Sequence, residues 1–189
     1  MSRKSKNGGI KQTTAFDNVF TFTKTTIPQP IEDKLLDAFT NFSEYKGIDD
    51  ILISQLPELF VKYLHISPKL AYFIKSEQFV LEGTTDIVDF EKYLFNGYLF
   101  LTLNKGIKTL DFYWNLVVPE SPSNEPAYKR KLYMNDIKKL TEIIGDTNEV
   151  SSDLLIDMLT VPNSGEDKLY VDYFDFGLIL GRIGELVGY

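Results

Sequence analysis

A change of hydrophobic period near the end of the printed sequence most strongly restricts what this chain can fold into. Val171 stands between Tyr170 and Asp172, in the alternation expected of a short strand. From Tyr173 onward, apolar residues recur at intervals of three and four, which predicts an amphipathic helix. One aliphatic strand residue is therefore expected to lead directly into a helix.

This strand-to-helix pattern occurs four times, and it is typical of the second half of an EF-hand. In that motif an aliphatic residue takes position eight of a twelve-residue loop, and an acid at position twelve begins the exiting helix. By this numbering, position twelve is occupied by Gln55, Lys92, Asp136 and Asp175, at intervals of 37 to 44 residues. Two helices, a loop and a link need about this length, so the pattern indicates a structural repeat.

We predict an all-α fold with two lobes, each made of two degenerate EF-hands whose loops pair through a short two-stranded ribbon. Residues 1–27 are expected to form a flexible N-terminal arm, residues 28–104 an N-terminal lobe and residues 105–189 a C-terminal lobe. The lobe boundary is placed where 104–106 interrupts the helical pattern. Helices are predicted at 31–42, 56–64, 67–75, 90–103, 108–118 and 135–144, with two more beginning near 152 and 173.

The loops lack the residues that hold calcium in an EF-hand, which needs oxygens at positions one, three, five and twelve and a glycine at six. Lys168 and Leu169 take positions five and six of the last loop, and Lys92 takes position twelve of the second. The first loop has Gln55 at position twelve and one residue too many. The third has Asp136 there, but its first positions fall near residues 125–126. We therefore expect no metal ligands and no cofactor.

Residue usage argues against an enzyme. The chain has no cysteine and a single histidine, His65, so Cys-ligated zinc and a thiol nucleophile are excluded. The Asp175–Gly177 sequence resembles a magnesium-binding kinase motif, but no glycine-rich loop accompanies it. We expect no catalytic residues. The absence of a long apolar run and of a signal-peptide core favours a soluble intracellular protein without membrane contact.

Charge is distributed unevenly along the chain. The net charge is −7, which disfavours direct, specific binding of nucleic acid. Basic residues nevertheless cluster within the first eleven positions, where a solvated tail is the default and an import signal or a DNA-contacting arm stays open. Four apolar residues that follow could dock the arm on the body: Phe16, Val19, Phe20 and Phe22.

Four segments, in order along the chain, resemble the small centrin-like accessory proteins of yeast nucleotide excision repair, a branch of the calmodulin and centrin superfamily. The most specific is Asp172–Gly181, within the longer block 170–184. The other three are 51–60, 82–90 and 138–146, so the resemblance covers about residues 31–186. The N-terminal arm shows no such resemblance.

The resemblance implies a calmodulin-like fold and a nuclear, non-enzymatic role in DNA damage recognition. Members of this family bind the C-terminal region of the damage-recognition subunit, the counterpart of the xeroderma pigmentosum group C protein. We expect this chain to bind an amphipathic helix there without calcium, as a monomer within a heteromeric complex. The alternative is a helix-binding adaptor of another complex, such as the cytoskeleton or the spindle pole.

An apolar groove in the C-terminal lobe is the predicted binding site for the partner helix. The C-terminal lobe has more large apolar residues than about eighty residues can bury, so part of them should face outward. The rival interpretation is that they form a closed core. The predicted groove residues are Leu110, Trp114, Val117, Leu140, Ile143, Leu155, Met158, Leu159, Phe176, Ile179, Leu180 and Ile183.

Overall fold

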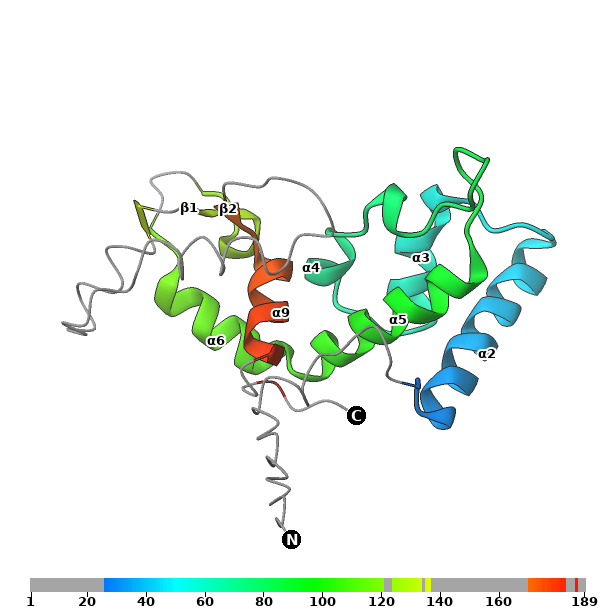
Figure 1. The fold of residues 1–189 in the computed structure, drawn as a ribbon, viewed down its shortest axis with the longest axis horizontal. Coiled ribbons are helices and arrows are strands. Elements are labelled where there is room, and N and C mark those ends of the chain that lie inside the picture. The colour runs from blue at the N-terminus through cyan, green and yellow to red at the C-terminus, as the bar shows by residue number, and fades with distance from the viewer. Residues whose placement is uncertain (1–25, 121–123, 134, 137–169, 183–185, 187–189) are drawn as a thin grey trace, which may run out of the picture.

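The structure is a computed structural model that describes residues 26–120, 124–133, 135–136, 170–182 and 186 (Figure 1). Within these ranges the chain is mostly helical, in agreement with the predicted all-α class. One antiparallel ribbon joins β1 (Leu132–Tyr133) to β2 (Tyr170–Val171). The helices are α2 (Gln29–Lys46), α3 (Leu56–Lys62), α4 (Pro68–Ala71), α5 (Phe90–Lys105), α6 (Ile107–Val117) and α9 (Tyr173–Arg182), with 3-10 turns η1 (Ile53–Gln55), η2 (Ser76–Gln78) and η3 (Ala127–Lys129).

Helix starts follow the signals in the sequence. The Ser67 side chain accepts a hydrogen bond from the Lys69 amide and caps α4, as its place before a proline predicts. The Asp89 carboxylate accepts one from the Lys92 amide and caps α5. These caps satisfy backbone amides that have no partner inside the helix. The predicted helices therefore begin within one or two residues of the observed ones.

Helix ends are predicted less well. The helix expected at 31–42 continues to Lys46, because the first residue suited to stop it is Gly47. Gly47 adopts a left-handed conformation with φ of 63°, and its amide donates to the Glu44 carbonyl. Glycine reaches this conformation without steric cost, which makes it a common helix terminator. The apolar face ends near Phe42, but the helix does not.

The prediction of a helix at 67–75 is also wrong at its end, since α4 stops at Ala71. Beyond it, the Phe73 ring packs on two aromatic residues of the second half of the chain. Its centroid lies 6.1 Å from that of Tyr173 and 6.3 Å from that of Phe174, with nearly parallel planes. Stacking of this kind stabilises beyond the burial of area alone. Tertiary packing therefore overrides the local helical period.

Aromatic rings fill the core of the first half. Phe60 is fully buried, and its ring meets those of Phe79, Tyr93 and Phe100 at centroid distances of 5.7, 6.0 and 5.2 Å. The Tyr93 hydroxyl donates to the Leu35 carbonyl at 2.9 Å, which ties α5 to α2. Burial raises the pKa of Tyr93 far above its usual value. This hydroxyl therefore remains protonated and acts only as a structural donor.

Helix α9 packs against α6 and α5 (Figure 1) and completes the core of the second half. The Trp114 ring lies 5.7 Å from that of Tyr173 and 5.3 Å from that of Phe176, and its indole donates to the Ala127 carbonyl. Close approach depends on Gly177. A Cβ atom there would come within 3.1 Å of side-chain atoms in α5 and α6. Glycine at this position therefore permits the close packing of α9 on α5 and α6.

A polar network also joins the two halves. Lys69 on α4 donates to both carboxylate oxygens of Asp111 on α6, each at 2.8 Å, and the Tyr173 hydroxyl donates to the same carboxylate at 2.8 Å. Tyr173 is fully buried; burial and this hydrogen bond raise its pKa. The predicted lobe boundary at 104/105 stays a prediction. No helix among the described residues is long and apolar enough to cross a bilayer.

We predict that Asp111→Ala lowers the free energy of unfolding by about 1–3 kcal/mol, because it leaves the buried Tyr173 hydroxyl without its acceptor. Chemical denaturation measures the change, and Asp37→Ala, an exposed aspartate on α2, is the matched control. In a Tyr173→Phe background the hydroxyl is gone, so Asp111→Ala should cost less. Equal costs in both backgrounds would contradict the coupling.

Candidate functional site

The two halves of the chain present similar loop pairs. In the second half, β1 and β2 place Leu132 opposite Val171, the two residues predicted at position eight. Both are 2% exposed. In the first half, the Val88 amide donates to the Ile51 carbonyl at 2.9 Å, and these too are the predicted position-eight residues. Each loop pair is thus joined at the same predicted position, with its aliphatic side chains in the core.

At the predicted position twelve, three side chains accept hydrogen bonds from backbone amides three residues earlier. The Asp136 carboxylate accepts from the Tyr133 amide at 3.0 Å, and the Gln55 side chain accepts from the Leu52 amide at 2.9 Å. In the last loop, Asp175 accepts from the Asp172 amide at 3.4 Å.

In all three of these loops, the donor is the backbone amide at the predicted position nine. The Asp172 carboxylate also accepts from the Asp175 amide at 2.9 Å, so this pair forms a reciprocal capping box. Oxygens at the place of a metal ligand are therefore engaged as helix caps.

Lys92 closes the second loop by a different contact. Its ammonium donates to the Val80 carbonyl at 2.8 Å, across the base of the loop. Asn96, one turn further along α5, donates to the Gln78 carbonyl at 2.7 Å. A side-chain cation thus meets a backbone oxygen at the predicted position twelve, where an EF-hand would hold a carboxylate on its metal. Sequence analysis identified Lys92 as incompatible with calcium but did not predict this contact.

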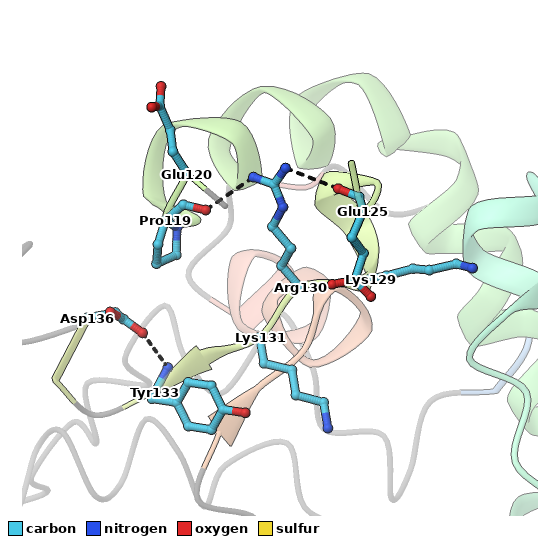
Figure 2. A pocket seen from close by; sticks show the side chains of 8 residues that line it. All are labelled: Pro119, Glu120, Glu125, Lys129, Arg130, Lys131, Tyr133 and Asp136. Carbon is cyan, nitrogen blue, oxygen red and sulfur yellow. Dashed lines mark hydrogen bonds between the residues drawn. The ribbon is translucent and has the colours of Figure 1, made fainter. Parts of the chain in front are cut away.

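The third loop encloses an open pocket beside β1 (Figure 2). Within the lining of this pocket, the Arg130 guanidinium donates to the Pro119 carbonyl at 3.1 Å and to the Glu125 carbonyl at 3.0 Å. The Lys131 ammonium lies 3.9 Å from the centre of the Tyr170 ring, a cation–π contact across the ribbon. The pocket is lined by Pro119, Glu120, Glu125, Lys129, Arg130, Lys131, Tyr133 and Asp136.

The mixed lining of this pocket does not indicate a catalytic centre, because its cations are engaged with carbonyls or aromatic rings. Lys129 lies 5.0 Å from the Tyr72 ring centre, in the manner of Lys131. Among the described residues, no group of three or more His, Asp or Glu side chains is arranged to hold a metal. His65 is exposed and has a positive φ of 56°, and its carbonyl accepts a hydrogen bond from Asn104.

The predicted groove residues that the structure describes lie on α6 and α9, and contacts join these two helices. Trp114 contacts Phe176, and Leu110 lies beside Gly177. Leu110 and Trp114 are almost fully buried, Ile179 and Leu180 are 9% and 5% exposed, and Val117 and Phe176 are half-buried. The groove and the closed core therefore both stay possible interpretations of this surface. Leu140, Ile143, Leu155, Met158, Leu159 and Ile183 lie outside the described residues.

Of three comparisons with known proteins, one finds a similar sequence. Over 177 residues it is 25% identical to the DNA repair protein RAD33 of Saccharomyces cerevisiae, an alignment that covers 91% of this chain and 95% of that protein. No protein-family model matches the chain. No solved structure matches it.

We predict that Asp175→Ala lowers the melting temperature equally in excess calcium and in chelator, because Asp175 acts as a helix cap. Loss of a cap costs about 1 kcal/mol in the free energy of unfolding. Thermal melting followed by circular dichroism measures both conditions, with Asp37→Ala as control. Wild-type protein should melt at one temperature in both. A rise in melting temperature with calcium that Asp175→Ala abolishes would identify this carboxylate as a metal ligand.

Proposed function

We propose that this chain is a non-enzymatic accessory subunit of a nuclear DNA repair complex, where it binds an amphipathic helix of a damage-recognition partner. The observation that carries the proposal is its similarity, over nearly the whole of both chains, to a yeast protein named for DNA repair. The segments that resemble the centrin-like repair proteins provide the more specific part, including the helix-binding role. Neither the similarity to the yeast protein nor the resemblance of these segments depends on a catalytic residue.

The proposed architecture is two EF-hand-like lobes. Its support is the repetition of one arrangement in both halves: opposed position-eight residues, followed by a capped helix. Leu132 with Val171, and Ile51 with Val88, occupy equivalent places in their loop pairs. EF-hand pairs join their loops through such short antiparallel contacts, and this arrangement directs the exiting helices to one side.

Binding is proposed to be independent of calcium. In a calcium sensor, the bidentate carboxylate at position twelve draws the exiting helix toward the metal. Here Lys92 carries the wrong charge for that role, and Asp136 and Asp175 are engaged by backbone amides. Protein hydrogen bonds therefore already supply the loop-closing contacts that calcium would provide.

The proposed binding surface is the seam between α6 and α9. Val117 and Phe176 are half-buried there, beside the buried Trp114. A partner helix with apolar residues spaced by one turn could extend this core, which is the usual mode of helix-in-groove recognition. The partner proposed from the family resemblance is the C-terminal region of the damage-recognition subunit.

Substitutions on two faces of α6 test the binding surface. We predict that Val117→Glu lowers retention of the damage-recognition subunit at least tenfold in affinity purification from native cells. Phe112→Glu is the matched control, since Phe112 is 62% exposed on the same helix. Circular dichroism excludes unfolding, and Phe176→Ser provides a second variant. Equal retention by all three folded variants would contradict the seam as binding site.

Loss of the protein tests the repair role in cells. We predict that a deletion strain of the native host is sensitised to ultraviolet light and accumulates less damage-recognition subunit, because the subunit loses its bound partner. Survival curves and immunoblots provide the measurement, and reintroduction of the wild-type gene is the control. Normal survival, together with purification of the protein in a cytoskeletal or spindle-pole complex, would favour the adaptor alternative instead.

A further inference from the structure

Three extended segments lie side by side at the loop end of the first half. Leu52 bridges Ile87, the Val88 amide donates to the Ile51 carbonyl, and the Leu81 amide donates to the Ile87 carbonyl at 2.8 Å. Opposite residues of antiparallel segments project to the same face. The segments therefore carry an inner row of Ile51, Val88 and Val80, and an outer row of Leu52, Ile87 and Leu81.

The outer row is apolar but faces away from the core. Leu52 is 37% exposed and Leu81 is 39% exposed, with Ile87 half-buried between them, whereas Ile51 and Val88 in the inner row are 1% and 7% exposed and Val80 is half-buried. Leu81 belongs to the loop that precedes α5 and projects from the helices (Figure 1). Aliphatic side chains aligned on an outer face are typical of a docking surface.

The chain around this outer row is strongly acidic. Residues 47–57 and 76–91 together contain seven carboxylates and no lysine or arginine. Asp49, Asp50, Glu82 and Asp86, which are next to the outer row in sequence, are all exposed. Three lysines border these ranges: Lys92 is bonded to the Val80 carbonyl, Lys46 is paired with Glu58, and Lys75 directly precedes Ser76. An apolar row in this setting fits a ligand that combines basic residues with apolar anchors.

The first 25 residues of the chain have this composition. They contain five of its 20 basic residues and only one of its 27 acidic residues, so residues 26–189 carry a net charge of −11. Four of the basic residues, Arg3, Lys4, Lys6 and Lys11, precede the apolar group formed by Phe16, Val19, Phe20 and Phe22. Charge and apolar content therefore both complement the loop end.

The chain length allows this segment to reach the loop end. Helix α2 has 18 residues and separates residue 29 from the first loop by about 27 Å. An extended chain spans about 3.3 Å per residue, so the stretch from Lys11 to Gln29 covers up to about 60 Å. A tether of this length also gives the segment an effective concentration on the order of millimolar at the loop end.

From these observations we infer that the acidic loop end is an intramolecular docking site, and that its occupant is the basic segment 1–25 of the same chain. Carboxylates of the two loops attract Arg3, Lys4, Lys6 and Lys11, and the outer row receives apolar side chains of the segment. The contact covers a surface distinct from the α6–α9 seam, and it does not depend on the proposed repair role.

A spin label near the N-terminus tests this contact in the full chain. The protein has no cysteine, so Ser5→Cys provides a unique attachment site. Nuclear magnetic resonance spectra are recorded with the label oxidised and reduced, near physiological salt and in high salt. We expect at least a twofold loss of amide signal for residues 50–53 and 81–87 with the oxidised label. High salt should restore the signal, because screening shortens the range of attraction.

Two triple variants with equal changes of charge separate a local site from general attraction. Asp49→Lys, Asp50→Lys and Glu82→Lys together should abolish the signal loss. Asp33→Lys, Asp37→Lys and Glu44→Lys, at exposed positions of α2, should leave it unchanged. Full signal at 50–53 and 81–87 in the wild type overturns the inference, as does an equal effect of both triples. Loss of signal only after adding a basic partner protein would assign the surface to that protein and likewise overturn it.

Discussion

The burial of Tyr173 at the start of α9 is the contact on which the rest of the described structure depends. This one residue packs on Trp114 from α6 and on Phe73 beyond α4, while its hydroxyl donates to Asp111. Because Asp111 also binds Lys69, the contact joins the two halves by both apolar and polar interactions. The direction of α9, and with it the seam between α6 and α9, follows from this arrangement.

The carboxylates at the predicted position twelve cap helices, whereas in a calcium-binding EF-hand a carboxylate there would bind the metal. An acid there can bind a metal only if its oxygens face the loop. In this chain, Asp136 and Asp175 instead accept hydrogen bonds from amides three residues earlier. A capping carboxylate stabilises a helix N-terminus through those amides and the helix dipole. The same residue type therefore supports the helix without requiring a bound ion.

Among the described residues, a side-chain cation bonds to backbone carbonyls in the second and third loops. Lys92 crosses the second loop to the Val80 carbonyl, and Arg130 joins the Pro119 and Glu125 carbonyls of the third. Hydrogen bonds from charged donors are stronger than neutral ones, and each of these connects chain segments that are separate in the sequence. They give a physical reason why these loops stay closed without the ligand set that a calcium-binding EF-hand needs.

The sequence by itself determined the helical class and the places where helices begin, because hydrophobic period and capping are local properties. The repeat placed Leu132 and Val171 at equivalent positions of two loops expected to pair, and they do pair. The sequence also located part of the candidate seam, since Trp114 and Phe176 do come together. It missed the early end of α4 and the network joining Lys69 to Asp111 and Tyr173. Only the tertiary structure decided these, because the partners lie 42 and 62 residues apart and no local pattern encodes which of many compatible groups will meet.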